Sequence, residues 1–316
     1  MKVFVTREIP DIGFELFKKA KINFEWHKKD SPVSRRQLLI NVKECDGLIC
    51  LLTERIDREV IDTMKNCRII SNFAVGYNNI DVDYAKSKNI IVTNTPDVLT
   101  ESTADLTMAL VLACARRISE GEKYLKDGKY KSWKPKLLLG MELRNKMFGI
   151  LGAGRIGTAV ALRAKAFGTK IIYRSLNKNL SLEEQTGAKK VDLNFLLRHS
   201  DILSVHLPLN EHTYHLLNKQ KLQLLKKNSI IINTARGEII EEQYLIELLK
   251  TGKVRAAGLD VFENEPYVNP ALLKLQNVVV LPHLGSATVE ARNGMAELAA
   301  KNVIRVLQGK RPLTPV

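Results

Sequence analysis

The chain has 316 residues, of which 45% are hydrophobic and 26% charged. This composition is typical of a globular protein, and the length is enough for two ordinary domains. No apolar run reaches the roughly 18 residues that a membrane-spanning helix needs. Acidic and turn residues follow the first apolar run too soon for a secretory signal. We therefore expect a cytoplasmic protein without a membrane partner.

Lysine and arginine together number 49 against 34 aspartates and glutamates, which gives a formal net charge of +15. Such an excess is found in many nucleic-acid-binding proteins. Here the lysines are scattered, with no long basic block and no interleaved aromatic residues. We therefore expect no nucleic-acid partner, but a basic surface that favours an anionic substrate and a phosphate-rich cofactor.

Four cysteines lie in or beside apolar stretches, at Cys45, Cys50, Cys67 and Cys114. Cys45 and Cys50 are close enough in sequence to suggest a metal or redox pair. Their apolar surroundings instead favour buried free thiols in a reducing compartment. No spacing of histidine and cysteine resembles a zinc site, so no metal is expected.

Short apolar runs alternate with amphipathic segments from the start of the chain. In the first series, strands are expected at residues 2–5, 22–26, 47–52, 68–73 and 89–94, with helices such as 9–20 and 56–67 between them. A long apolar helix over 103–125 and a looser segment to residue 143 follow. In the second series, strands are expected at 146–151, 170–174, 202–207, 229–235, 254–261 and 278–282, before a closing helix at 287–309. This alternation predicts two α/β domains, each with a parallel sheet.

The second series contains the string GILGAGRIGTAV at residues 149–160. Its spacing Gly152-x-Gly154-x-x-Gly157 lies directly after a strand pattern and opens a helix pattern that ends near Gly168. In a dinucleotide-binding βαβ unit, the first glycine permits a tight turn and the second lets the backbone approach the pyrophosphate. The third allows close packing of helix and strand. The free N–H groups of the helix then bind the phosphates.

The end of the next strand decides which dinucleotide is favoured. An NAD site usually has an acidic residue there, which accepts a hydrogen bond from the ribose 2′-OH. Here Arg174 and Ser175 occupy that stretch, with Lys178 close behind. An arginine and a hydroxyl can bind a 2′-phosphate, so NADP(H) is the expected cofactor and NAD(H) remains possible. The alternative is that Arg174 and Lys178 are ordinary surface charges.

Three ionisable residues follow three successive strands of the second series. They are Arg236 in NTARGEII, Glu265 in GLDVFENEP and His283 in LPHLGSAT. Ligands bind at the carboxyl edge of open α/β sheets, so these side chains can converge on one crevice. His283 can donate a proton to a reduced carbonyl, Glu265 favours the charged imidazolium, and Arg236 can hold a carboxylate. This is the chemistry of hydride transfer to a 2-keto acid.

The chain resembles the D-isomer-specific 2-hydroxyacid dehydrogenase family, and within it the glyoxylate/hydroxypyruvate reductases. The resemblance is carried, in family order, by LLTERID, SNFAVGYNNIDV, VTNTPDVLTESTADL, LGAGRIG, HLPL, NTARGEII, GLDVFENEP and LPHLGSATVEAR. It implies two Rossmann-like or flavodoxin-like parallel-sheet domains with a cleft between them. Residues 1–98 with 287–316 would bind the substrate, and residues 99–286 would bind NAD(P). The two crossings near 97–101 and 285–288 would act as hinges.

The resemblance also implies roles for individual residues. Arg236, Glu265 and His283 would be the catalytic set. Substrate binding would involve Leu52, the N–H groups of Val75 and Gly76, Arg236 and His283; for Val75 and Gly76 a plain strand-to-loop turn is the alternative. The implied cofactor-binding residues are Thr103, Gly152, Gly154, Arg155, Ile156, Gly157, Arg174, Ser175, Thr234, Ala235, Asp260 and Gly285.

The segment from residue 103 to 140 resembles the dimerisation arm of this family, which implies a homodimer. Trp133 would then reach toward the substrate pocket of a partner. The expected activity is NADPH-dependent reduction of a small 2-keto acid, either glyoxylate or hydroxypyruvate. Two alternatives stay open: reduction of bulkier 2-keto acids, and a cofactor-sensing scaffold similar to a corepressor.

Overall fold

The computed structural model describes residues 1–316, which divide into two compact units. Unit 1 comprises Met1–Leu99 and Ser286–Val316, and unit 2 comprises Thr100–Gly285. These limits differ by one residue from the expected domain boundaries. Each unit contains one sheet, of five or seven strands, and all neighbouring strands are parallel. The predicted α/β class with two parallel sheets is confirmed. No helix has both the length and the apolar character to cross a membrane.

The sheet of unit 1 has the strand order β2-β1-β3-β4-β5, as in flavodoxin-like folds. Its strands are β1 (Lys2–Val5), β2 (Asn23–Trp26), β3 (Gly47–Cys50), β4 (Ile69–Asn72) and β5 (Ile91–Thr93). The central strands β3 and β4 are buried along their whole length, because helices cover both faces of a parallel sheet.

One face of this sheet is covered by α1 (Asp11–Lys19) and α13 (Val289–Leu307), the last helix of the chain. Small residues allow the close approach: a Cβ added at Gly47 would lie 3.1 Å from a methyl of Val303 on α13. The other face carries α2 (Arg35–Val42), α3 (Arg58–Thr63) and α4 (Val82–Ser87). The three cysteines of unit 1 and Cys114 of unit 2 are buried free thiols, as the sequence predicted.

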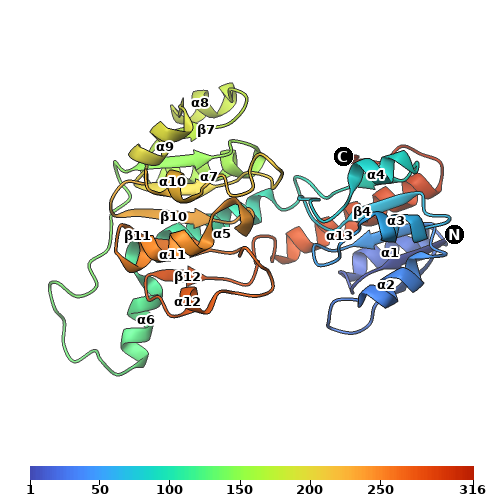
Figure 1. Ribbon diagram of the computed structural model, residues 1–316, viewed down its shortest axis with the longest axis horizontal. Helices are drawn as coiled ribbons and strands as arrows, with labels where there is room; N and C mark the ends of the chain where they lie inside the picture. The colour runs from blue at the N-terminus through green and yellow to red at the C-terminus, as the bar shows by residue number, and fades with distance from the viewer. The chain divides into compact units, whose positions relative to one another are not determined.

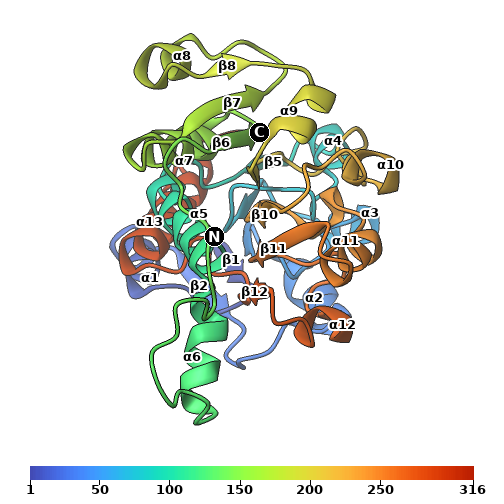
Figure 2. The ribbon, with the colours of Figure 1, turned by 90° about the vertical axis from the view of Figure 1, so that its left-hand side faces the viewer.

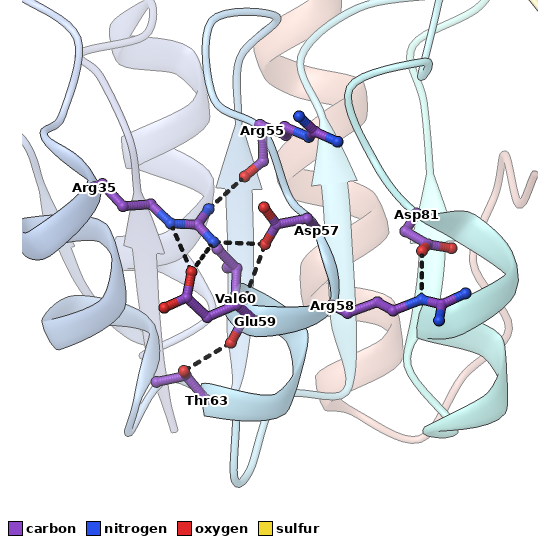
Figure 3. Close-up of polar contacts among 8 residues, drawn as sticks. All are labelled: Arg35, Arg55, Asp57, Arg58, Glu59, Val60, Thr63 and Asp81. Carbon is purple, nitrogen blue, oxygen red and sulfur yellow. Dashed lines mark hydrogen bonds and ion pairs between the residues drawn. The ribbon is translucent and has the colours of Figure 1, made fainter.

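An arginine connects α2 to α3 on the surface of unit 1 (Figure 3). Arg35 Nη2 lies 2.6 Å from Asp57 Oδ1 and also pairs with Glu59, while Nη1 donates to the carbonyl oxygen of Arg55 at 3.1 Å. Solvent-exposed ion pairs of this kind contribute about 0–1 kcal/mol each. Their structural effect is local: they hold the loop that follows β3 against the two helices.

The sheet of unit 2 has the strand order β12-β11-β10-β9-β6-β7-β8. Its strands are β6 (Met147–Leu151), β7 (Lys170–Arg174), β8 (Lys189–Lys190), β9 (Ile202–Val205), β10 (Ser229–Asn233), β11 (Val254–Leu259) and β12 (Val278–Val280). The direction of strand succession reverses between β6 and β9, which is the switch point of a doubly wound sheet. Ligands in such folds bind beyond the carboxyl ends of the strands near this point.

Helices cover both faces of the second sheet (Figure 2). On one side, α5 (Thr100–Arg116), α7 (Arg155–Ala166) and α8 (Leu180–Thr186) pack on one hydrophobic core. On the other side, α9 (Leu193–His199), α10 (Lys219–Leu222), α11 (Glu242–Lys250) and α12 (Pro270–Leu273) enclose a second core. A short 3-10 turn, η1 (Gly237–Ile239), precedes α11.

The expected single helix over residues 103–125 is wrong. The chain forms α5 and then α6 (Ile118–Lys126), separated by Arg117 in a left-handed conformation with φ of 55°. The N–H of Met141 donates to the carbonyl oxygen of Ala115 at 2.7 Å, so the last turn of α5 has a hydrogen-bond partner from a segment distant in sequence. Beyond this break, α6 and the segment after it stand away from the sheet of unit 2 (Figures 1 and 2).

Candidate active site

The glycine turn joins β6 to α7 and has the backbone geometry that its spacing predicts. Gly152 has φ of +103°, and a Cβ there would lie 2.6 Å from the carbonyl oxygen of His206. A Cβ at Gly157 would lie 2.0 Å from the carbonyl oxygen of Gly152. Both positions therefore require glycine, because any side chain would collide with backbone.

Gly154 differs from the other two glycines, because an added Cβ there would meet no atom within 4 Å. The residue is exposed and forms the N-cap of α7, and no side chain caps this helix. Arg155 and Ile156 are its first residues. An open space in front of an uncapped helix N-terminus fits the pyrophosphate of a dinucleotide, which accepts hydrogen bonds from such N–H groups.

At the end of β7, Arg174 and Ser175 are half-buried. The guanidinium of Arg174 donates to the carbonyl oxygen of Ser175, and the Ser175 hydroxyl donates to that of Asn177. A guanidinium has five N–H donors, so this one bond leaves others for a ligand. Lys178 is different, since its ammonium lies 3.0 Å from Glu183 Oε2 and forms an ion pair.

Asn179 connects the glycine turn to this loop and was missed by sequence reasoning. Its Nδ2 donates to the carbonyl oxygen of Ala153 and to Thr158 Oγ1, both at 3.0 Å. Its Oδ1 accepts from the N–H of Leu182 at 3.0 Å and so caps α8. Asparagine is common in loops and at helix N-caps, and this pattern alone does not indicate a contact with the preceding βα turn.

Arg236, Glu265 and His283 follow β10, β11 and β12, which are neighbours in the sheet. His283 Nδ1 lies 2.9 Å from Glu265 Oε2, and Glu265 Oε1 accepts from the N–H of Phe262 at 3.0 Å. Burial alone would raise the pKa of Glu265, but the hydrogen bond and charge of His283 lower it below the usual value. The carboxylate is therefore ionised at neutral pH.

Arg236 is held in an Asx-type turn at the end of β10. Asn233 Nδ2 donates to the Arg236 carbonyl at 2.8 Å, and its Oδ1 accepts from the N–H of Ala235 at 3.0 Å. The guanidinium of Arg236 donates through Nη1 to the Ala235 carbonyl at 2.7 Å. Burial lowers the pKa of Arg236, while the charge of Glu265 opposes that shift. Arg236 is half-buried, and in such a setting a bound carboxylate interacts more strongly than it would in bulk water.

Asp260 holds the segment that follows His283. Its two carboxylate oxygens accept from the N–H groups of Leu284 at 2.6 Å and Gly285 at 2.7 Å. The Gly285 carbonyl accepts from Thr103 Oγ1 at 3.0 Å, at the start of α5. Burial raises the pKa of Asp260, and the two N–H donors oppose that shift.

The expected cofactor residues of unit 2 therefore lie in two groups. The first group lies at the ends of β6 and β7 and consists of Gly152, Gly154, Arg155, Ile156, Gly157, Arg174 and Ser175. The second group lies at the ends of β10 to β12 and on α5, and consists of Thr103, Thr234, Ala235, Asp260 and Gly285. In the second group, the hydroxyl of Thr234 lies 2.9 Å from the hydroxyl of Thr107 on α5. Thr107 was not predicted.

In unit 1, Leu52 and the pair Val75 and Gly76 lie beyond the carboxyl ends of the neighbouring strands β3 and β4. Leu52 and Gly76 are half-buried, as part of the loops that follow these strands. Neither the N–H of Val75 nor that of Gly76 donates a hydrogen bond to another atom of unit 1. These two donors are therefore available to an anion.

Comparison with known proteins identifies the family. The sequence profile of the D-isomer specific 2-hydroxyacid dehydrogenase NAD binding domain matches residues 108–285. Over 315 residues the chain is 48% identical to a glyoxylate reductase of Thermococcus litoralis, covering 98% of this chain and 95% of that protein. The chain belongs to the D-isomer-specific 2-hydroxyacid dehydrogenase family. It is therefore an oxidoreductase that uses a nicotinamide dinucleotide.

Solved structures agree with this assignment over the full length of the dehydrogenase. The TT0316 protein of Thermus thermophilus matches with a TM-score of 0.94 and 40% identity, covering 100% of both chains. The NADPH-dependent glyoxylate/hydroxypyruvate reductase of Sinorhizobium meliloti, in complex with NADP and malonate, matches with a TM-score of 0.87 and 31% identity. That match covers 100% of this chain and 96% of the other.

A second histidine and carboxylate pair connects the loops that carry Arg236 and Glu265 and was not predicted. His215 Nε2 lies 2.7 Å from Glu263 Oε1, and Glu263 Oε2 accepts from the N–H of Glu242 at 3.2 Å, at the start of α11. The N–H of His215 donates to the Glu238 carbonyl at 2.8 Å. Residues 215 and 263 are 48 apart, so no local pattern reveals the pair. It holds the segment before Glu265 against the segment after Arg236.

The same two segments touch through their backbones. A Cβ added at Gly237 would lie 1.9 Å from the carbonyl carbon of Phe262, so only glycine fits directly after Arg236. Small displacements of one loop are therefore transmitted to the other.

We expect Glu263→Gln to lower kcat about tenfold with a 2-keto acid and reduced cofactor. Loss of the negative charge weakens the bond to His215, and the shift of the loop misplaces Glu265 relative to His283. Steady-state kinetics together with the melting temperature measure the effect. His212→Ala, an exposed position on the same segment, is the matched control and keeps the wild-type rate. A His215→Ala variant with unchanged kcat would show that the pair does not position Glu265.

Proposed function

We propose that this dehydrogenase reduces glyoxylate or hydroxypyruvate to the corresponding 2-hydroxy acid, with His283 as the proton donor. The observation that carries the proposal is the 2.9 Å contact between His283 Nδ1 and Glu265 Oε2. A carboxylate on Nδ1 fixes the orientation of the ring and leaves Nε2 to carry the transferred proton. The names of the relatives support the substrate class, since both the Thermococcus litoralis and the Sinorhizobium meliloti proteins are glyoxylate reductases.

In this reaction the carbonyl oxygen gains negative charge in the transition state. His283 neutralises that charge by donating its Nε2 proton, and Glu265, ionised because its pKa is lowered, holds the ring through Nδ1. Arg236 binds the substrate carboxylate, and the N–H groups of Val75 and Gly76 donate to it. When bound, the reduced nicotinamide supplies the hydride that completes the reduction.

The residues proposed to hold the dinucleotide are those that the sequence indicated. The open turn at Gly154, with Arg155 and Ile156 at the start of α7, binds the pyrophosphate, while Asp260 holds Gly285 in place for the nicotinamide end. The proposed contacts near the ribose and nicotinamide also include Thr103, Thr234 and Ala235.

The activity is tested with purified protein, NADPH, and glyoxylate, hydroxypyruvate, pyruvate or phenylpyruvate. We expect turnover with the first two acids to exceed that with the others by at least about tenfold, followed as loss of nicotinamide absorbance. His283→Gln lowers kcat by about 10²- to 10⁴-fold, the usual contribution of a general acid. Its affinity for NADPH, measured by fluorescence, stays within about twofold, which serves as the internal control. Turnover confined to phenylpyruvate would move the assignment to bulkier 2-keto acids.

The cofactor that we propose is NADP(H). Support comes from Arg174 and Ser175 at the end of β7, where an NAD-specific site usually has an acidic residue. The relative from Sinorhizobium meliloti, which is named as NADPH-dependent, was solved with NADP. Arg174 pairs with the 2′-phosphate through charge-assisted hydrogen bonds, whereas Lys178 is engaged by Glu183.

Arg174→Ala is expected to raise KM for NADPH about tenfold or more and to leave KM for NADH within about twofold. The loss corresponds to one charge-assisted phosphate contact, about 1.4 kcal/mol or more. Lys178→Ala is the matched control on the same loop, and it leaves both values near wild type. Wild-type protein that prefers NADH would disprove the proposed role of Arg174.

We further propose that the dehydrogenase forms a homodimer through α6 and the segment that follows it. Large apolar side chains there are exposed in the single chain: Ile118 (54%), Leu125 (63%), Tyr130 (51%) and Trp133 (77%). Exposed apolar side chains concentrated on one projecting element are typical of a protein–protein interface. Burying them against a second copy would remove that area from water.

Analytical ultracentrifugation should therefore give about twice the chain mass of 35.6 kDa. Leu125→Glu shifts the population toward the monomer, because a charge would be buried in the interface. Leu273→Glu, which alters an equally exposed leucine on α12, leaves the mass unchanged. A wild-type monomer would overturn the proposal. If Trp133→Ala leaves the substrate preference unchanged, Trp133 does not contact the substrate pocket of a partner.

A further inference from the structure

The loop after β4 is anchored by three successive carbonyl groups. The Ala74 carbonyl accepts from the N–H of Thr95 at 2.9 Å, and the Val75 carbonyl accepts from Asn94 Nδ2 at 2.8 Å. The Gly76 carbonyl accepts from Asn72 Nδ2 at 2.7 Å. All three donors come from the ends of β4 and β5, so one side of the loop is fixed to the sheet.

Each anchored carbonyl determines where the next N–H points. In a trans peptide the C=O and the following N–H point in opposite directions across one rigid plane. The only cis peptide of the chain is Glu265–Pro266, so this holds throughout the loop. Fixing the carbonyls of residues 74, 75 and 76 therefore directs the N–H groups of Val75, Gly76 and Tyr77 away from the anchoring side. None of the three donates to another atom of unit 1.

Asn94 is itself held in place by a segment distant in sequence. Its N–H donates to the Thr314 carbonyl at 3.3 Å, and its own carbonyl accepts from Thr314 Oγ1 at 2.6 Å. The Thr314 hydroxyl also accepts from Asn302 Nδ2 at 2.8 Å. Asn302 lies on α13 and is fully buried, and its Oδ1 accepts from the N–H groups of Leu313 and Thr314 at 2.7 and 3.2 Å.

Residues 313–316 thus lie along the outer edge of β5. Thr93 pairs with Pro315 in an antiparallel bridge, and the N–H of Val316 donates to the Val92 carbonyl at 3.1 Å. Polar contacts therefore run without a break from Asn302 on α13 through Thr314 and Asn94 to the Val75 carbonyl. This path connects the last helix to the loop that carries the free N–H groups.

We propose that Asn94 and Thr314 are positioning residues for substrate binding, which fix the Val75–Gly76 peptide so that its N–H meets the substrate carboxylate. The inference rests on the proposed function, in which that loop binds the carboxylate. An unanchored peptide can rotate about its neighbouring φ and ψ angles, so the donor would have to be ordered on each binding event. Tyr77, the third residue with a directed N–H, is a further donor to the same anion.

A purely structural role gives a different expectation. If the contacts only satisfy buried polar groups, removing them lowers stability without changing the affinity for substrate in the fraction that remains folded. If they position the donor, KM for the keto acid rises while kcat and KM for the cofactor change little, because the carboxylate is bound in the ground state and in the transition state alike.

The test compares Asn94→Ala, Thr314→Val and Thr314→Ser, assayed with glyoxylate and NADPH at a temperature where all are folded. Thr314→Val keeps the shape and removes the hydroxyl, whereas Thr314→Ser keeps the hydroxyl. We expect KM for glyoxylate to rise about tenfold in Asn94→Ala and roughly three- to tenfold in Thr314→Val. The serine variant stays within about twofold of wild type, as does KM for NADPH in all three.

NMR amide signals of a ¹⁵N-labelled wild-type sample distinguish a wrong carboxylate site from a wrong positioning role. Addition of oxamate, an unreactive carboxylate analogue, with NADP should shift the Val75, Gly76 and Tyr77 signals. If these signals do not move, the carboxylate binds elsewhere and the proposed function is wrong in its substrate contacts. If they move but both Asn94→Ala and Thr314→Val retain the wild-type KM for glyoxylate, the carboxylate site stands and the positioning role is overturned.

Discussion

The parallel direction of every strand is the constraint on which the functional arrangement of this dehydrogenase depends. Because crossover helices return the chain to the same edge each time, the loops after β10, β11 and β12 begin side by side. Arg236, Glu265 and His283 are thereby brought within reach of one another although 47 residues separate the first from the last. The same constraint places the glycine turn after β6 and the Arg174 loop after β7 at that edge. In unit 1 the loops after neighbouring parallel strands likewise begin side by side, and they carry Leu52 and Val75.

Asparagine side chains then give these loops a defined backbone. Asn233 bonds to both Ala235 and Arg236, Asn179 connects two loops at the glycine turn, and Asn94 fixes the peptide after Val75. A side-chain amide has both donors and an acceptor, so it can replace the ladder partners that the backbone loses where a strand ends. Loop backbone held in this way presents N–H groups without further ordering when a ligand arrives. Short polar side chains therefore help to preorganise these loops.

At the ends of β10 to β12, the cost of burying ionisable side chains is offset by neighbouring charges and N–H groups. Arg236, Asp260 and Glu265 each lose hydration, yet every one has specific compensation from a neighbouring charge or N–H group. Buried ionised groups without such partners would neutralise or destabilise the fold. The lowered pKa of Glu265 and the raised pKa of Asp260 show how two carboxylates in one loop region differ, because one hydrogen-bonds to an imidazole and the other only to amides. One carboxylate is therefore paired with a histidine ring, and the other holds backbone.

The sequence by itself determined the features whose physical cause is local. Alternating apolar and amphipathic segments specified the parallel α/β class, the glycines specified a turn that tolerates no side chain at Gly152 and Gly157, and the ends of strands indicated Arg236, Glu265 and His283. Only the tertiary structure decided the contacts between distant segments. His215 and Glu263 are 48 residues apart, and Asn94 and Thr314 are 220 apart, so no periodicity or motif connects them. The sequence does not indicate the break at Arg117, because the helix pattern continues locally, whereas in the structure Arg117 is left-handed and Met141 bonds to the Ala115 carbonyl. Local propensity fixes which elements can form, whereas long-range hydrogen bonds fix where they end and how their loops are held.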